Sequence, residues 1–146
     1  MDLFPLSLLY EDEELLVVDK PPGLRVVQDG YQPDLPSVRA ILDSRYGKVF
    51  IVHRLDKDTS GLLVVARTPS SHKFLNDQFN LRSIEKEYHA VVISHQSFPP
   101  RLSVNQPLRV NGDRRHRTVV DFQYGKPAET DFESIESYGN ITLVKA

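Results

Sequence analysis

The feature that most constrains the fold of this chain is a series of short apolar runs separated by polar or proline-containing breaks. Runs of this length, rich in valine, leucine and isoleucine, are typical of β-strands. They occupy residues 6–10, 15–19, 49–52, 62–66, 84–93, 128–135 and 141–145. The pattern predicts an α+β fold with a mixed, mostly antiparallel β-sheet and a few flanking helices.

Two stretches have helical character instead. Residues 37–46 place their apolar side chains on one face, and Gly47 is suited to end that helix. A second helix is expected to begin at Thr68-Pro69, with Thr68 as N-cap and Pro69 in the first helical position. Within the irregular stretch 99–125, Asn111-Gly112 predicts a hairpin turn.

Length and composition narrow the class of protein. The 146 residues suit one domain, expected to span 1–146. The chain has no cysteine, which excludes disulfides, thiolate metal sites and cysteine nucleophiles. It has neither a long apolar span nor a signal peptide, so we expect a cytoplasmic protein without a membrane partner.

Charge alone does not point to nucleic acid. The net charge is −2, whereas proteins that bind nucleic acid usually show a basic footprint. Acidic residues dominate before Pro36, and basic residues gather later, most densely in Arg114-Arg115-His116-Arg117. That run is as consistent with a solvated hairpin tip as with a phosphate contact.

The densest polar segment is the loop 53–61, which lies between two apolar runs. Loops held on a rigid sheet are where reactive groups are usually placed. Thr59 and Ser60 can bond to neighbouring backbone groups, and Gly61 permits a tight return or a close approach to a ligand. The composition of the loop therefore indicates a candidate site.

Asp56 is the candidate reactive group of this loop. It lies between Arg54 and Lys57, and nearby cations favour an ionised carboxylate that can act as nucleophile or base. Asp58 is an equal candidate on chemistry alone, and a charged surface turn explains the same residues. A hydrolase that uses both carboxylates ranks lower, since their spacing gives no reason to expect glycosidase geometry.

Four stretches in order resemble the RluA-type pseudouridine synthase family. The first similarity is in His53-Arg54-Leu55-Asp56, followed by Thr59-Ser60-Gly61-Leu62-Leu63-Val64. The other three are Asp19-Lys20-Pro21-Pro22-Gly23-Leu24, Glu85-Lys86-Glu87-Tyr88-His89-Ala90-Val91-Val92 and Gly125-Lys126-Pro127-Ala128-Glu129-Thr130. Together they extend over nearly the whole chain and are far more specific than any one of them.

The resemblance implies an enzyme that isomerises uridine to pseudouridine in ribosomal or transfer RNA, with no cofactor and no metal. It implies that Asp56 is the catalytic carboxylate and that Tyr88 stacks against the target uracil. It also implies RNA-binding or loop-shaping roles for His53, Arg54, Thr59, Ser60, Gly61 and Lys126. RNA is the expected partner, and no protein partner is expected.

The sequence also departs from the family pattern. The family follows the strand 141–145 with an arginine-containing segment that pairs with the catalytic carboxylate, and this chain ends at Ala146. We therefore expect a C-terminally incomplete catalytic domain with little or no activity alone, and no separate S4-type RNA-binding domain. The alternative is a catalytically dead RNA-binding module of the same fold.

Overall fold

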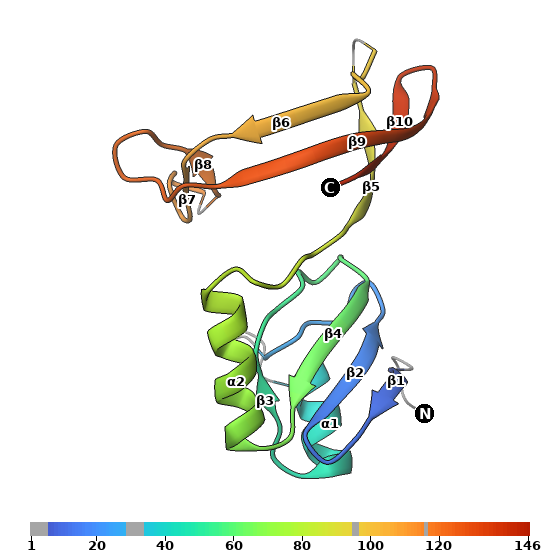
Figure 1. Cartoon of the computed structure of the whole chain (residues 1–146), viewed down its shortest axis with the longest axis vertical. Helices are drawn as coiled ribbons and strands as arrows, with labels where there is room; N and C mark the ends of the chain where they lie inside the picture. Colours follow the sequence, from blue (N-terminus) through green and yellow to red (C-terminus); the bar gives the residue numbers. More distant parts are fainter. Residues whose placement is uncertain (1–5, 29–33, 95–96, 116) are drawn as a thin grey trace. The chain divides into compact units, whose positions relative to one another are not determined.

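The chain folds into two compact units, Met1–Glu85 and Lys86–Ala146 (Figure 1). The computed structural model describes residues 6–28, 34–94, 97–115 and 117–146. Both units are built mainly from antiparallel strands, and both helices belong to the first unit. This agrees with the α+β class that the pattern of short apolar runs predicts.

The sheet of the first unit has four strands in the order β1-β2-β4-β3. The strands are β1 (Ser7–Glu11), β2 (Leu15–Lys20), β3 (Phe50–Ile51) and β4 (Gly61–Ala66). β2 and β4 pair over their full lengths, from Leu15 opposite Ala66 to Lys20 opposite Gly61. This register places the end of β2 beside the start of β4, where the polar loop enters the sheet.

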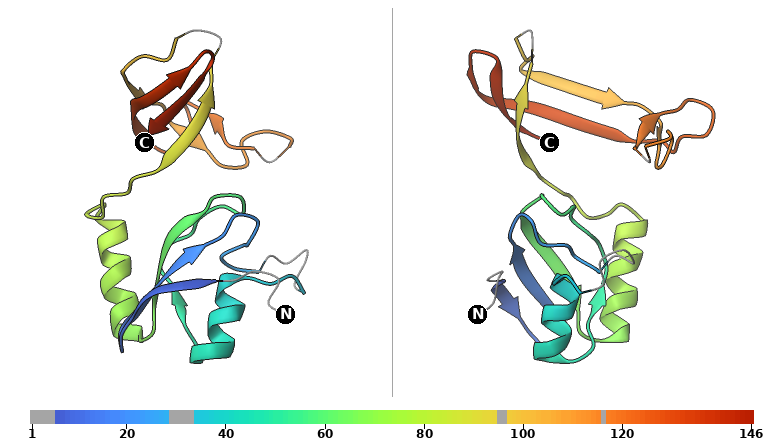
Figure 2. Two further views of the ribbon diagram at one scale, coloured as in Figure 1. Left: turned by 90° about the vertical axis from the view of Figure 1, so that its right-hand side faces the viewer. Right: turned by 180° about the vertical axis from the view of Figure 1, so that it is seen from behind.

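The two helices cover opposite faces of this sheet (Figure 2). They are α1 (Val38–Tyr46) and α2 (Pro69–Asn80). The main core gathers the alternate, inward-facing residues of β2 and β4 with α1 and the adjoining loops: Leu6, Leu16, Val18, Leu24, Val26, Val38, Leu42, Val49, Leu55, Leu63 and Val65. Burying such side chains removes apolar surface from water and is the main stabilising contribution to the fold.

The helix boundaries match the sequence signals. Ser37 is the N-cap of α1, and its hydroxyl oxygen accepts a hydrogen bond from Ala40 N at 3.2 Å. Gly47 ends α1 with φ of +75°, a left-handed conformation that favours glycine. Thr68 caps α2 by accepting from Ser71 N at 3.1 Å, and Pro69 follows at the first helical position. The predicted starts and the stop of these helices are confirmed.

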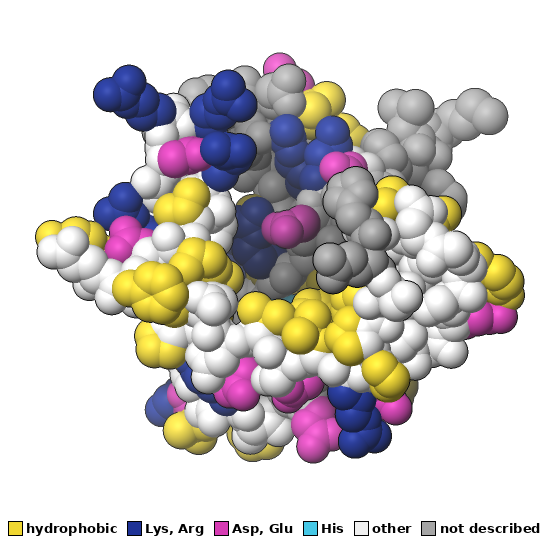
Figure 3. All heavy atoms as spheres, turned by 90° about the horizontal axis from the view of Figure 1, so that it is seen from above, with side chains coloured by type: hydrophobic (Ala, Val, Ile, Leu, Met, Phe, Trp, Pro, Cys, Tyr) yellow, Lys and Arg dark blue, Asp and Glu magenta, His cyan; other side chains and the backbone are white. Residues whose placement is uncertain are grey.

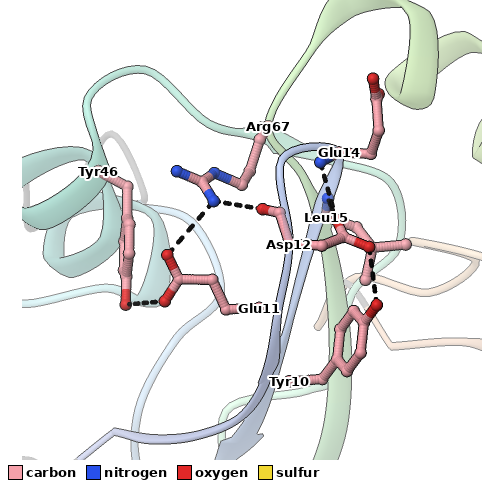
Figure 4. A network of polar contacts seen from close by, with 7 residues as sticks. All are labelled: Tyr10, Glu11, Asp12, Glu14, Leu15, Tyr46 and Arg67. Carbon is pink, nitrogen blue, oxygen red and sulfur yellow. Dashed lines mark hydrogen bonds and ion pairs between the residues drawn. The ribbon is translucent and has the colours of Figure 1, made fainter.

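The acidic turn between β1 and β2 is an ordered network rather than a simple solvated turn (Figure 4). Asp12 Oδ1 accepts from the backbone N–H of Glu14 at 2.8 Å and of Leu15 at 2.7 Å. The Arg67 guanidinium donates to the carbonyl oxygen of Asp12 and to Glu11 Oε1, the latter at 3.3 Å. The network ties this turn to the end of β4.

The network predicts an acid-dependent loss of stability. Hydrogen bonds from the backbone N–H groups of Leu15 and Glu14 hold the pKa of Asp12 below its ordinary value. A carboxyl with a lowered pKa stabilises the fold above its unfolded pKa of about 4, and the contribution is lost as pH falls through the folded value. We expect Asp12→Asn to be less stable than the wild type at pH 7, with the difference vanishing towards pH 2. Urea unfolding across this range measures the effect, and a difference independent of pH contradicts it.

The second unit contains a four-stranded antiparallel sheet and a small two-stranded one. The larger sheet has the order β5-β10-β9-β6, and β7 pairs with β8 in the smaller. The strands are β5 (His89–Ile93), β6 (Arg101–Asn105), β7 (Leu108–Arg109), β8 (Val119–Val120), β9 (Glu129–Tyr138) and β10 (Ile141–Lys145). Asn111, with φ of +54°, lies in the β7–β8 connection, as the Asn-Gly pair predicts.

The strand expected over 84–93 is shorter in the structure. β5 begins at His89, and residues 85–87 are exposed and charged, so they add no apolar surface to a sheet. Tyr88 remains bound to the sheet through two backbone hydrogen bonds of 2.8 Å with Ala146. The expected boundary was wrong by several residues, while the position of Tyr88 beside β10 agrees with the expectation of a sheet residue.

Gly125 closes a turn that supports the β7–β8 hairpin, and we expect Gly125→Ala to destabilise it. A Cβ at this position would lie 2.9 Å from the carbonyl oxygen of Pro107 and would also meet that of Asp121, both of them backbone atoms. The expected loss is about 2 kcal/mol of unfolding free energy or more, because the backbone must shift. Gly139→Ala is the control, since Gly139 has φ of +60° but no heavy atom within 4 Å of its Cβ position. Equal losses in the two variants, measured by urea unfolding, contradict the steric account.

Candidate functional site

The loop between β3 and β4 has alternating anchored and exposed residues. Leu55 is 6% exposed and belongs to the main core. Its neighbours Arg54 and Asp56 are both exposed. The buried Leu55 therefore anchors the loop in the core. The Asp56 carboxylate beside it stays accessible to a ligand.

Lys20 is the last residue of β2, and its side chain joins the loop of Asp56 to the turn that follows β2. Its side chain is fully buried, with 0% exposure. Its Nζ donates to the carbonyl oxygens of Pro21 at 3.0 Å, Leu24 at 2.8 Å and Lys57 at 3.0 Å. An ammonium group has three donors, so the three carbonyls satisfy it completely. The Lys20 ammonium therefore links the turn after β2 to the loop of Asp56.

The two carboxylates of this loop also act on the buried Lys20 ammonium. Burial lowers the pKa of Lys20, whereas the negative charges of Asp58 and Asp56 raise it. Among the described residues, neither Arg54 nor Asp56 takes part in an ion pair. The surface ion pair that would make this loop an ordinary charged turn is therefore not formed.

Backbone bonds hold the remaining part of the loop. Thr59 N donates to the carbonyl oxygen of Asp56 at 3.2 Å, which closes a turn around the two aspartates. Gly23 N donates to the carbonyl oxygen of Lys57 at 2.8 Å. Gly61 starts β4 with φ of +120°, a conformation that side chains rarely adopt. Ser60 is exposed beside it.

His53 connects the start of the loop to β4 and α2. Its Nε2 accepts a hydrogen bond from Val64 N at 3.0 Å. Its ring stacks on that of Phe79, with 4.7 Å between centroids and 23° between planes. No local sequence pattern indicates that Phe79 meets His53. The structure thus brings His53, Asp56, Asp58, Thr59, Ser60 and Gly61 together with Lys20.

Tyr88 and Lys126, two other residues singled out in the sequence, belong to the second unit. Tyr88 is 40% exposed, so part of its ring is available to a ligand. Lys126 is exposed, and its backbone exchanges two hydrogen bonds of 2.9 Å with Leu108. The side chain of Lys126 is therefore presented from a fixed backbone position at the β7–β8 hairpin.

The β7–β8 hairpin carries basic and aromatic side chains side by side. Arg109 lies over the ring of Tyr124 at 5.8 Å, and its Nε is 3.1 Å from Asp121 Oδ2. Asp113 holds Arg117 through contacts of 2.7 Å to Nε and 2.6 Å to one terminal nitrogen. The exposed basic and aromatic side chains of this region include Arg114, Arg115, Arg117, Lys126, Phe122 and Tyr124.

Figure 3 shows Lys and Arg side chains and hydrophobic side chains exposed at the surface, and within the second unit the cation of Arg109 lies over the ring of Tyr124. A surface that mixes cations with aromatic rings suits single-stranded nucleic acid, because cations meet phosphates and rings stack with bases. Among the described residues, no group of three or more His, Asp or Glu side chains is arranged to hold a metal ion. Neither described helix is long and apolar enough to cross a membrane.

The comparison with protein families decides the family of the chain. Residues 14–146 match the family described as RNA pseudouridylate synthase. The chain belongs to this family. The match includes the loop of Asp56, the turn of Lys20 and the strand after Tyr88, so the four ordered sequence similarities lie within it.

Individual relatives agree with the family assignment. Ribosomal large subunit pseudouridine synthase D of Zymomonas mobilis is 39% identical, covering 97% of this chain and 47% of its own length. Dual-specificity RNA pseudouridine synthase RluA of Escherichia coli K12 is 37% identical, covering 90% of this chain and 59% of its own length. The chain thus spans about half the length of these curated relatives.

Solved structures show the same fold. Human RNA Pseudouridylate Synthase Domain Containing 1 superposes with a TM-score of 0.78 at 23% identity, covering 99% of this chain and 60% of that one. Human RNA Pseudouridylate Synthase Domain Containing 4 gives a TM-score of 0.74 at 21% identity, covering 95% and 57%. The α+β architecture is therefore that of pseudouridylate synthase domains.

Proposed function

We propose that this chain provides the catalytic carboxylate of an RNA pseudouridine synthase, with Asp56 in that role. The observation that carries the proposal is the exposed Asp56 on a loop fixed by Leu55 and Lys20, within a region that matches the family. Relatives named as pseudouridine synthases of the ribosomal large subunit and of dual RNA specificity support an RNA substrate. The substrate we propose is ribosomal or transfer RNA in the cytoplasm.

The reaction breaks the bond between N1 of the uracil and C1′ of the ribose, then forms a bond between C5 and C1′. The hydrogen on C5 leaves as a proton and the freed N1 takes up a proton, so the product is an isomer of the substrate. A carboxylate is suited to this reaction as nucleophile or as base, and no redox step is involved. The exposed position of Asp56 allows either role.

The target base must leave its stack to meet a carboxylate on a protein loop. Tyr88, with part of its ring exposed, is proposed to stack on the displaced uracil. Arg54 and Lys126 are proposed to contact phosphates, since both side chains are exposed cations. Unstacking costs least in loops and bulges, so these are the proposed RNA sites.

Release of tritium from RNA labelled at C5 of uridine tests the proposal. The assay compares the 146-residue chain with a hybrid in which the portion of the Escherichia coli relative beyond the aligned region follows Ala146. We expect release above background from at least one form, with none from its Asp56→Asn counterpart. If both forms are folded and bind RNA but release no tritium from total cellular RNA, the binding-module alternative is favoured.

A further inference from the structure

His53 lies where the edge strand β3 leaves β4. The β3–β4 ladder pairs Phe50 with Ala66 and Ile51 with Val65, and it ends there. The backbone N–H of Val64 then donates to Nε2 of His53 at 3.0 Å. A side chain thus takes over as acceptor where the backbone of β3 departs from the sheet.

The chemistry of this contact defines the form of the ring. A backbone N–H can only donate, so Nε2 must carry a lone pair, which requires neutral imidazole with its proton on Nδ1. The Phe79 ring stacks on the imidazole at 4.7 Å, which limits rotation of the side chain. The ring of His53 is therefore held by β4 and by α2.

Three successive odd-numbered positions of the loop are tied down. His53 binds Val64 N, Leu55 is buried in the core, and the carbonyl of Lys57 accepts from the buried Lys20. The residues between and after these ties, Arg54, Asp56 and Asp58, are all exposed. This alternation explains why Asp56 is accessible and yet has a fixed backbone.

We propose that His53 is a positioning residue of the catalytic loop. Its neutral imidazole replaces the strand partner of Val64, fixes the point where the chain leaves the sheet, and so sets the location of Asp56. The catalytic meaning of this location rests on the proposed function. The contacts themselves are independent of any RNA.

Amide hydrogen exchange of the 146-residue chain, followed by NMR, tests the proposal. His53→Phe keeps an aromatic ring against Phe79 but has no acceptor for Val64 N. We expect exchange to accelerate about tenfold or more, relative to the β2–β4 ladder, at Val64, at Thr59 of the loop, and at Gly23, whose amide donates to the loop carbonyl of Lys57. His53→Gln offers a side-chain oxygen as acceptor, and we expect it to restore most of the protection.

His72→Phe is the matched control. His72 also lies at an aromatic contact between α2 and the sheet, stacked on Phe50 at 5.2 Å. Its Nε2 lies 2.9 Å from the side-chain amide of Asn76 within α2, rather than beside an amide of β4. We expect His72→Phe to leave the loop amides unchanged. Acceleration that is uniform over the whole unit in His53→Phe would indicate a merely structural role and overturn the proposal.

The imidazole ¹⁵N spectrum of the unsubstituted chain provides a test that needs no folded variant. We expect the tautomer with the proton on Nδ1 at neutral pH, and a proton on Nε2 would overturn the proposal. In whichever form is active on RNA, His53→Phe should lower kcat with little change in KM, with recovery in His53→Gln. If the exchange and tautomer results appear but neither form isomerises uridine, the proposed function fails while the positioning role stands.

Discussion

Replacing Asp56 by asparagine should lower the rate of uridine isomerisation by about a thousandfold or more, because the amide is neither a nucleophile nor a base. The side chains are nearly the same size, and Asp56 is exposed, so we expect little change in unfolding free energy. The measurement is the rate of tritium release from C5-labelled RNA under single-turnover conditions, in whichever form of the protein is active.

Asp58→Asn is the matched control for this prediction. Asp58 lies in the same loop, is also exposed, and its charge also acts on Lys20. We expect Asp58→Asn to retain activity within about tenfold of the wild type, since the loss of a nearby charge perturbs the loop without removing the reacting group. If Asp58→Asn is the inactive variant and Asp56→Asn is not, the roles of the two carboxylates must be exchanged.

Replacing Lys20 by methionine should be the most damaging change to the stability of the first unit. Methionine approximates the length of lysine but removes the ammonium donor from the carbonyl oxygens of Pro21 and Leu24, and leaves that of Lys57 with the N–H of Gly23 alone. Buried acceptors without donors are costly, and we expect a loss of about 3 kcal/mol in unfolding free energy. Urea unfolding monitored through the first unit measures it.

Lys57→Met distinguishes this effect from the loss of any lysine. The side chain of Lys57 is exposed, and only its backbone carbonyl takes part in the contact with Lys20. We expect this control to change the unfolding free energy by less than about 0.5 kcal/mol. An equally small effect of Lys20→Met would show that water replaces the ammonium at no cost, and the proposed tie between the turn and the Asp56 loop would be abandoned.

The sequence is sufficient to locate the loop of Asp56 because local patterns define it. The β-rich runs 49–52 and 62–66 predict strands on both sides, and β3 and β4 lie within these bounds or within one residue of them. The caps at Thr68 and Gly47 are likewise local, since each depends on a few neighbouring residues. Features of this kind follow from short-range geometry.

The contacts of Lys20 and His53 depend on tertiary structure and cannot be predicted in this way. Lys20 reaches the carbonyl of Lys57, which lies 37 positions later, and such a contact appears only when β2 and β4 are paired. The stack of His53 on Phe79 likewise requires α2 to pack on the sheet. The one local sign that the Lys20 ammonium is buried is its position, at the end of an apolar run and before Pro-Pro-Gly.

The turn between β1 and β2 illustrates the same limit. Its acidic composition suggests only solvent exposure, and indeed Glu11 and Glu14 are exposed. Arg67, more than fifty positions away, converts the turn into a bonded network by donating to Glu11 and to the carbonyl of Asp12. The signs of the charges along the sequence do not reveal which distant cation will contact this turn.

Nucleoside analysis of the RNA tests the central claim most directly. Loss of tritium from C5 also accompanies simple proton exchange, whereas isomerisation converts one nucleoside into another of equal mass. After reaction with the active form, digestion and chromatography should show pseudouridine gained in the amount that uridine is lost, and no gain with the Asp56→Asn protein. Tritium release without pseudouridine, or pseudouridine formation that persists in Asp56→Asn, would contradict the assignment of Asp56 as the catalytic carboxylate.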